Sequence, residues 1–313
     1  NTEEGTCRMR TRKLGKLGPE VPVLCLGAWP LGGGMGELPD QQVIDTVHAA
    51  LDCGVTFIDT AEAYRTSESV LGKALASRRD QVFLATKLSG DHSMDHMNEA
   101  IENSLRALGT DYIDLYQLHS PKPEYPIADT MGGLLRLKEQ GKIRHIGVSN
   151  FSAEQHAEAL QYGHLDSSQP MYSMLVRTAE EAVLPFCREN GIGVIVHSPL
   201  AKGLLTGKYA PDQRFPEGDE RSWMAGFQGE RFAAALRVAD ELKAWAQSQG
   251  RSLYELAIAW TLAHAAVTSC IAGAKTPEQA RQNAAAAEWI LTQDAVQELN
   301  RIQGDFRVLN LHR

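Results

Sequence analysis

Four polar side chains of complementary chemistry follow apolar runs in the N-terminal half of the sequence. Asp59 and Tyr64 lie in FIDTAEAY, Lys87 closes VFLATK, and His119 closes IDLYQLH. A carboxylate, a phenol, an ammonium and an imidazole are the groups needed to give or take a proton at a carbonyl. The loops after the strands of a parallel barrel open on one face, so these four side chains are predicted to meet there as a catalytic set.

The segments that would position these residues alternate between strand-like and helical patterns. Amphipathic segments near 40–53, 67–77 and 95–108 predict helices after the first three strand-like runs. The strand-like runs are VLCLG, FIDTA, VFLATK, IDLYQLH, IRHIGVSN, SSQPMYS, IGVIVHSP and TSCIAGA. Strands alternating with helices form parallel βαβ units, and about eight such units close into a barrel. We therefore predict an α/β fold, a (β/α)8 TIM barrel.

Two irregular segments and the chain's start complete this layout. RTRKLGKLGPEVP, with Gly18-Pro19 between polar residues, predicts an N-terminal β-hairpin across the barrel bottom. The stretch rich in Gly, Pro and charge between Pro199 and a helix near Gly229 predicts a long loop after strand seven, often a lid in enzymes. Residues 1–11 are predicted to be a flexible segment and 12–313 a single domain, since no Pro/Ser-rich linker divides them.

Composition excludes several classes of protein. The 313 residues carry a formal net charge of −8 and a pI near 5.7, without a clustered basic stripe, so a nucleic-acid role is not expected. No apolar stretch is long enough to cross a bilayer, and the polar N-terminus lacks the apolar core of a signal peptide. Five scattered cysteines without CxxC spacing favour reduced thiols and a cytoplasmic location. A monomer is the expected state, with a dimer left open.

Six longer motifs are more specific than any single residue. GVTFIDTAEAY, LATK, IDLYQLH, GKIRHIGVSNF, SPLAKGLLTGKY and GAKTPEQARQN follow one another in this order. In order and spacing they resemble the aldo-keto reductase superfamily, from roughly Arg12 to Gln303, and most closely bacterial members with an SPLxxGLLTGK loop. The resemblance implies reversible, NADPH-linked reduction of a small aldehyde or ketone to an alcohol, with no metal.

The resemblance also implies a role for each member of the catalytic set. Tyr64 would donate the proton, Lys87 would lower the pKa of the Tyr64 phenol, and Asp59 would hold the ammonium. His119 would orient the carbonyl oxygen or relay the proton in the other direction. Each residue also has a purely structural interpretation. Asp59 could be a helix N-cap, Tyr64 a half-buried aromatic residue, Lys87 a solvated residue at a strand end, and His119 a histidine whose ring nitrogens have hydrogen-bond partners within the fold.

The implied cofactor is NADP(H), held by three groups of residues. Ser149, Asn150 and Gln169 match the clamp on the nicotinamide carboxamide, although Ser149 or Asn150 could instead cap the helix near Ser152. His197 stands where many relatives have an aromatic residue beneath the nicotinamide. Further implied cofactor contacts are Gly27, Ala28, Trp29, Ser198, Leu200 and Gly273.

The phosphates of the cofactor have two expected partners. The SPLAKGLLTGKY loop would fold over the pyrophosphate through the amides of Gly203 and Leu204 and the cations of Lys202 and Lys208. Lys275 and the helix start at Thr276-Pro277 would hold the adenosine 2′-phosphate, which favours NADP(H) over NAD(H). On the adenosine side the resemblance places Gln279, Gln282 and Asn283. The structural alternative is that Lys275 is simply an exposed lysine before a helix that has Pro at its first position.

The expected substrate pocket is formed by Trp29, Tyr64, His119 and Ser120, with Tyr125 and Trp223 as further candidates to line it. Many relatives have a bulky side chain at the position of Ser120, so a more open or polar pocket is expected. GGGMG at 32–36 has the wrong spacing for a dinucleotide fingerprint, which argues against a Rossmann fold.

Two other classes of function would make different demands on the sequence. A barrel that senses NADPH and passes the signal to a partner protein would not need the four reactive side chains. A metal-dependent isomerase or hydrolase would need several His, Asp or Glu ligands at the strand ends. Those ends supply one His and one Asp, with Lys87 between them in the sequence.

Overall fold

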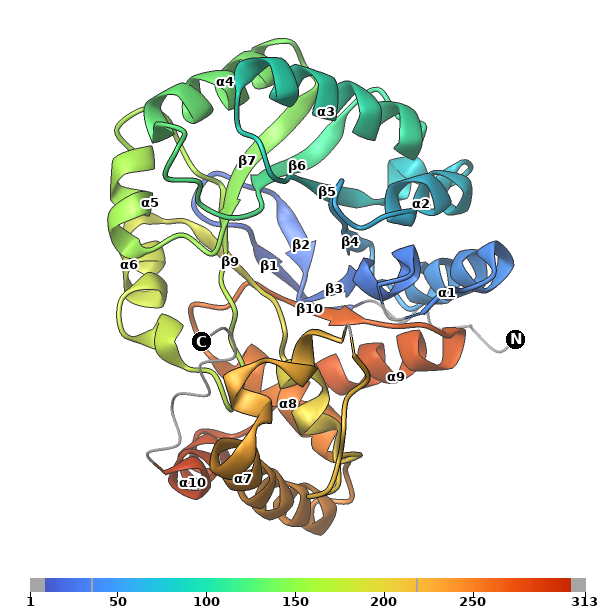
Figure 1. Cartoon of the computed structure of the whole chain (residues 1–313), viewed down its shortest axis with the longest axis vertical. Coiled ribbons are helices and arrows are strands. Elements are labelled where there is room, and N and C mark those ends of the chain that lie inside the picture. The colour runs from blue at the N-terminus through green and yellow to red at the C-terminus, as the bar shows by residue number, and fades with distance from the viewer. Residues whose placement is uncertain (1–8, 35, 218, 305–313) are drawn as a thin grey trace, which may run out of the picture.

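Eight parallel strands close into a barrel in the computed structural model, which describes residues 9–34, 36–217 and 219–304 (Figure 1). The strands follow chain order around the barrel, with β10 closing against β3, so the predicted (β/α)8 barrel is confirmed. They are β3 (Leu24–Gly27), β4 (Phe57–Asp59), β5 (Phe83–Leu88), β6 (Ile113–Leu118), β7 (Ile143–Ser149), β8 (Ser167–Gln169), β9 (Gly193–Val196) and β10 (Ser269–Gly273). Seven lie within their predicted strand-like runs, and β5 extends one residue beyond VFLATK, to Leu88.

Helices surround the barrel because each buries an apolar face against the strands. In chain order they are α1 (Asp40–Asp52), α2 (Ser67–Leu75), α3 (Met94–Leu108), α4 (Ile127–Glu139), α5 (Ala153–Ala159), α6 (Val183–Asn190), α8 (Leu253–Ala263) and α9 (Pro277–Ala287). Two more helices, α7 (Gly229–Ser248) and α10 (Gln293–Gln303), pack together at the lower edge of Figure 1. None of the helices within the described ranges is long and apolar enough to cross a membrane.

The predicted hairpin is present and closes the barrel bottom. β1 (Thr11–Lys13) pairs antiparallel with β2 (Glu20–Pro22). Leu14 and Val21 join the cluster of buried side chains that fills the barrel, with Phe57 and Leu115 among its other members. Of the segment expected to be flexible, residues 1–8 lie outside the described residues, whereas Met9 is buried and Thr11 begins β1.

The long loop after β9 is also confirmed. It runs from His197 to Gln228, and its described residues form short 3-10 turns, η4 (Ala201–Thr206), η5 (Glu220–Ser222) and η6 (Ala225–Phe227), before α7 begins. An aromatic cluster packs Tyr209, Phe215 and Phe227 of this loop against Phe232 of α7, with ring centroids 5.4 to 6.5 Å apart. This small core fixes the second half of the loop against α7.

Candidate active site

Asp59 and Lys87 form an ion pair inside the barrel. Asp59 is the last residue of β4, and Lys87 lies near the end of the adjacent strand β5. The Lys87 ammonium donates to the Asp59 carboxylate and, over 2.9 Å, to the carbonyl of Thr60, with the ion-paired side chains 1% and 3% exposed. Burial lowers the pKa of Lys87, but the negative charges of Asp59 and of the Tyr64 phenolate raise it by a larger amount. The net pKa of Lys87 therefore lies above its ordinary value. Lys87 is therefore not a solvated strand end.

The second oxygen of Asp59 accepts two amide hydrogen bonds. Gln117 Nε2 lies 3.0 Å and Gln169 Nε2 2.9 Å from Oδ2, and Gln169 also donates to Gln117 Oε1 over 3.0 Å. Asp59 thus serves this network rather than capping a helix. Gln117 was missed in the sequence, although a glutamine inside the apolar run IDLYQLH is a signal, because a buried amide needs partners.

Tyr64 lies in the turn between β4 and α2, beside this ion pair. Its ring centroid is 5.1 Å from Lys87 Nζ, and its hydroxyl is 3.5 Å from His119 Nε2. The expectation that its pKa is lowered is wrong for this structure: burial raises the pKa of the phenol above 10, and the lowering effect of Lys87 is smaller. Tyr64 is therefore protonated at neutral pH.

His119 follows β6 and has a partner on each ring nitrogen. Nε2 is the nitrogen near Tyr64, and Nδ1 is 2.7 Å from Ser89 Oγ. Burial, followed by the positive charge of Lys87, lowers the pKa of His119 from 6.5 to about 4. The imidazole is therefore neutral near pH 7, and its hydrogen-bonding role depends on which nitrogen carries the proton.

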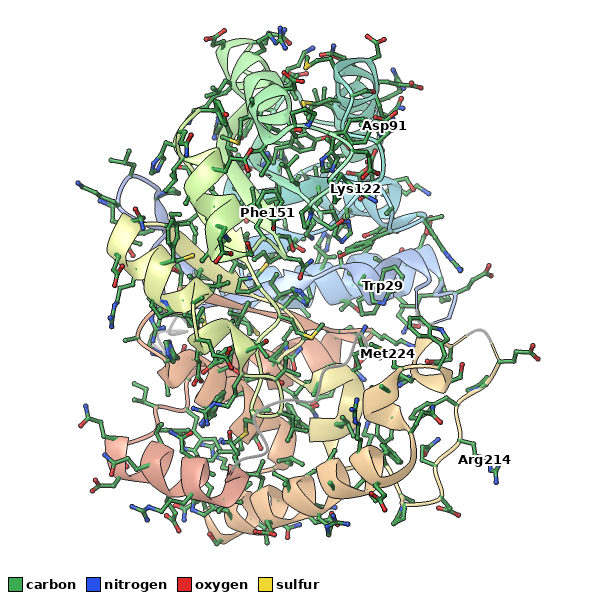
Figure 2. All side chains as sticks on the ribbon, turned by 60° about the vertical axis from the view of Figure 1, so that its left-hand side comes forward. Trp29, Asp91, Lys122, Phe151, Arg214 and Met224 are labelled. Carbon is green, nitrogen blue, oxygen red and sulfur yellow. The ribbon has the colours of Figure 1, made fainter. Side chains whose placement is uncertain are left out.

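The expected substrate wall is partly assembled. The Trp29 ring meets the Tyr64 ring edge-on with 5.0 Å between the ring centroids, and Trp29 is 41% exposed. In Figure 2 Trp29 lies between Lys122 above and Met224 below. The Tyr125 ring instead pairs with the His92 ring, and Trp223 is 67% exposed. Ser120 is half-buried directly after His119.

The residues expected at the nicotinamide lie together. Ser149 Oγ donates to the Gln169 carbonyl over 2.9 Å, and Asn150 Nδ2 donates to Ser149 Oγ and to the His119 carbonyl. His197 Nε2 is 3.0 Å from Asn150 Oδ1. Asn150 has a φ of 61°, a strained conformation of the kind that clusters at ligand sites. Ser152, rather than Ser149 or Asn150, caps α5, so the capping alternative is wrong.

The loop expected at the pyrophosphate has an unusual backbone. Ala201, Lys202 and Gly203 have φ values of 47°, 53° and 100° in succession, and Ser198 has 59°. The Gly203 N–H donates to the Leu200 carbonyl, so this amide already serves the loop's own turn, and Leu204 is buried. Tyr209 donates to the Lys202 carbonyl over 2.9 Å and holds the turn in place. Lys208 is exposed nearby.

The start of α9 has the expected helix-terminal geometry. Thr276 is the N-cap and accepts from the Gln279 N–H, and Pro277 is the first helical residue. The amides of the predicted adenosine-side residues have intramolecular partners: Gln279 Oε1 accepts from the Lys275 N–H, Gln282 donates to Glu278, and Asn283 donates to the Gly273 carbonyl. Gly27 pairs with Gly273 across β3 and β10, and Ala28 is buried just beyond.

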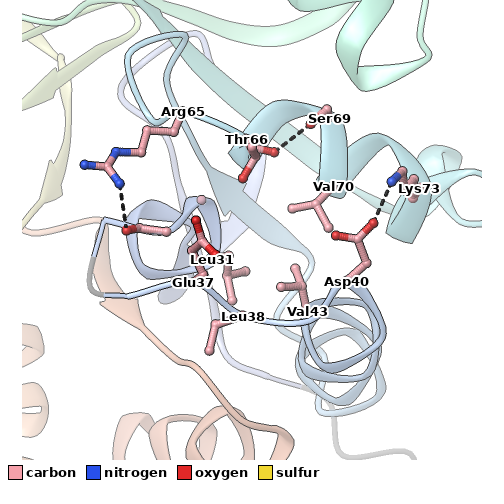
Figure 3. A pocket seen from close by; sticks show the side chains of 12 residues that line it. Leu31, Glu37, Leu38, Asp40, Val43, Arg65, Thr66, Ser69, Val70 and Lys73 are labelled. Carbon is pink, nitrogen blue, oxygen red and sulfur yellow. Dashed lines mark hydrogen bonds and ion pairs between the residues drawn. The ribbon is translucent and has the colours of Figure 1, made fainter.

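A cavity of about 300 Å³ lies behind the Tyr64 turn, between α1 and α2 (Figure 3). Leu31, Leu38, Val43 and Val70 line its apolar part, and a Lys73–Asp40 ion pair of 2.6 Å stands at its edge. It is separate from the hydroxyl of Tyr64 and from His119, neither of which lines it.

This combination of a closed parallel barrel and a Tyr, His, Lys and Asp cluster at its mouth defines a class of carbonyl-reducing barrel enzymes. Residues 23–303 match the model of the aldo/keto reductase family. The chain belongs to the aldo/keto reductase family, and it carries out nicotinamide-dependent reduction of carbonyl compounds.

Several proteins are similar to this chain in sequence or structure over most of its length. It is 38% identical over 309 residues to aldo-keto reductase YhdN of Bacillus subtilis (strain 168), covering 94% of this chain and 93% of the relative. It is 40% identical over 292 residues to the NADH-specific methylglyoxal reductase of Escherichia coli (strain K12), with 83% and 88% covered. Among solved structures, glycerol dehydrogenase AKR11B4 from Gluconobacter oxydans has a TM-score of 0.85 at 33% identity, with 96% and 95% covered.

Proposed function

We propose that this chain reduces aldehydes or ketones to alcohols with NADPH, with Tyr64 as the proton donor. The observation that carries the proposal is the position of the Tyr64 hydroxyl, 3.5 Å from His119 Nε2, on a ring 5.1 Å from Lys87 Nζ. A donor in this position can release its proton to a carbonyl oxygen as negative charge develops there.

The chain's own residues then have distinct tasks. Tyr64 starts protonated because burial keeps its pKa raised. After proton transfer, the phenolate lies beside the Lys87 ammonium, which stabilises it electrostatically. Asp59 keeps that ammonium charged inside the barrel, and Gln117 and Gln169 hold Asp59 in turn. His119 orients the carbonyl oxygen next to Tyr64.

Residues at the mouth fit a dinucleotide. NADPH supplies the hydride when it is bound. Ser149, Asn150 and Gln169 offer hydroxyl and amide groups at one place, which suits a carboxamide. Left-handed residues persist only where the surrounding structure enforces them, and the run from Ala201 to Gly203 supports a role in binding the phosphates. His197, Ser198, Leu200 and the lysines of the same loop complete this surface.

We propose NADP(H) rather than NAD(H) as the cofactor, because Lys275 adds a full positive charge at the N-terminus of α9, which favours a phosphate. Two curated relatives whose names specify a cofactor differ on this point: the Escherichia coli enzyme is named NADH-specific, whereas aldo-keto reductase yakc of Schizosaccharomyces pombe carries NADP(+) in its name.

We also propose that the enzyme is a cytoplasmic monomer whose substrates are small carbonyl compounds. The buried, free thiols of Cys25, Cys187 and Cys270 are consistent with a reducing compartment. Light scattering on the purified chain tests the monomer, which a mass of twice 34.3 kDa would contradict.

NADPH oxidation with a reactive aromatic aldehyde, measured for the native chain and Tyr64→Phe, tests the catalytic proposal. The variant keeps the ring but removes the proton donor, so a loss of at least about a hundredfold in kcat is expected with NADPH affinity retained. Tyr162→Phe, at an exposed tyrosine, is the matched control. Equal rates for the native chain and Tyr64→Phe would refute Tyr64 as donor, and NADPH binding without turnover in the native chain would favour a sensing role.

A further inference from the structure

Ser89 and His119 are brought side by side by the register of the barrel. Leu88 pairs with Leu118 at the ends of β5 and β6, and Ser89 and His119 directly follow the two strands. The backbone N–H of His119 donates to the Leu88 carbonyl over 2.9 Å, and the backbone N–H of Ser89 donates to the carboxylate of Glu62. Ser89 Oγ lies 2.7 Å from His119 Nδ1, and these two backbone hydrogen bonds fix the positions of both residues.

A neutral imidazole carries one N–H, and the partner on one nitrogen selects the role of the other. Burial keeps the His119 ring neutral near pH 7. If Nδ1 carried the proton, Nε2 would accept and would compete for the proton of Tyr64, 3.5 Å away. If Nε2 carries the proton, His119 and Tyr64 both point a donor toward the same place.

A carbonyl oxygen can only accept hydrogen bonds, so the second arrangement is the one that binds it. It requires a donor at Nδ1, and a serine hydroxyl can donate where a carbonyl or carboxylate could not. We propose that Ser89 is a positioning residue that donates its hydroxyl to Nδ1 and thereby holds His119 as the Nε2–H tautomer facing the substrate oxygen. This inference rests on the proposed role of His119 in orienting the carbonyl.

The tautomer can be measured without substrate or cofactor. In the full chain labelled with ¹⁵N-histidine, long-range ¹H–¹⁵N spectra distinguish the two nitrogens, and the signals lost in His119→Gln assign the ring among the 10 histidines. The native chain is expected to show Nε2–H at pH 7. Ser89→Thr keeps the hydroxyl and should keep this tautomer, whereas Ser89→Ala should populate Nδ1–H. Ser89→Asp, which can only accept, should convert His119 to Nδ1–H or to the charged ring.

Kinetics supply the second readout. Loss of one oriented donor should lower kcat/KM for an aldehyde by about ten- to a hundredfold in Ser89→Ala, with the dissociation constant of NADPH unchanged and the rate restored in Ser89→Thr. Ser248→Ala, an exposed serine whose hydroxyl donates to the Trp245 carbonyl, is the control.

The proposal is overturned if native His119 is the Nδ1–H tautomer, or if Ser89→Ala leaves the His119 spectrum unchanged. Failure of the proposed function gives a different pattern. In that case Tyr64→Phe or His119→Gln leaves turnover intact, while the effect of Ser89 on the His119 spectrum persists. A purely structural role of Ser89 would change the denaturation midpoint without moving the tautomer.

Discussion

Lys87 and Asp59 form an ion pair with side chains only 1% and 3% exposed, and the second oxygen of Asp59 is occupied by Gln117 and Gln169. Two charges removed from water are tolerated here because every oxygen of the carboxylate has a donor. The ammonium that faces the Tyr64 ring is thus fixed from the barrel interior, not from solvent.

Breaking this pair should be costly for folding. Lys87→Met leaves a buried carboxylate without its cation, and Asp59→Asn leaves a buried ammonium, so each should lower the free energy of unfolding by about 3–5 kcal/mol. Denaturant unfolding measures the change. Lys73→Met, in the exposed Lys73–Asp40 pair, is the control and should cost at most about 1 kcal/mol. Equal costs for the two pairs would contradict the argument from burial.

Gln117→Leu should weaken the Asp59 network. Asp59 loses one of its amide donors and Gln169 loses one of its two acceptors, a change expected to cost about 1–3 kcal/mol of stability. Because Asp59 then holds Lys87 less firmly, kcat for aldehyde reduction should fall as well, with NADPH affinity changed little. Gln161→Leu, at an exposed glutamine, is the matched control. Native kcat in Gln117→Leu would show that Asp59 does not depend on this amide.

Gly32→Ala should displace the Tyr64 turn. A Cβ at Gly32 would lie 2.1 Å from the Tyr64 carbonyl oxygen, so the backbone that carries Tyr64 has to move. Overpacking of this kind costs about 1–3 kcal/mol, and a displacement of about 1 Å can cost a hundredfold in rate. In Gly132→Ala, within α4, the new Cβ meets nothing within 4 Å, and that variant should retain full activity. An unchanged kcat in Gly32→Ala would contradict this prediction.

Acidification should destabilise the fold through its buried histidines. The pKa of His92 and of His119 is about 4 in the folded chain, lowered by burial from the ordinary 6.5. Between these pH values the unfolded chain binds protons that the folded chain does not, so stability is lost as pH falls from about 6.5 to about 4. Each residue should contribute about 1–2 kcal/mol between pH 7.5 and pH 5.

Denaturation midpoints at pH 7.5 and pH 5 measure this loss. His92→Gln and His119→Gln should each make the difference between the two midpoints smaller than in the native chain, whatever their effect on stability at pH 7.5. A difference that is unchanged in both variants would mean that these two histidines are not the source.

Lys275→Ala should weaken the binding of NADPH without weakening the binding of NADH. Removal of the cation at the start of α9 should weaken NADPH binding about tenfold or more, because a hydrogen bond to a charged group contributes about 1.5–3 kcal/mol. NADH lacks the 2′-phosphate and should bind as before. Protein fluorescence titration measures both affinities, with Lys16→Ala in the distant β1–β2 hairpin as the control. An unchanged affinity for NADPH would remove the 2′-phosphate assignment.

The order of the strands and the proximity of Asp59, Lys87 and His119 could be predicted from the sequence. The alternation of apolar runs and amphipathic helices is a local property, and parallel topology then places the ends of β4, β5 and β6 on one face. For that reason Asp59, Lys87 and His119 could be expected together. Tyr64, in the turn after β4, could be added because that turn opens on the same face.

The hydrogen-bond partners and the pKa shifts of these residues, in contrast, depend on how the folded chain packs. The inter-strand register brings Gln117 to Asp59 and Ser89 to His119, and no local pattern specifies such a pairing. The pKa of Tyr64 was expected to fall because of Lys87, yet it rises, since the phenol loses more through desolvation than it gains from the cation. Desolvation depends on the depth at which a group lies in the folded chain, and that depth is a property of the packed barrel.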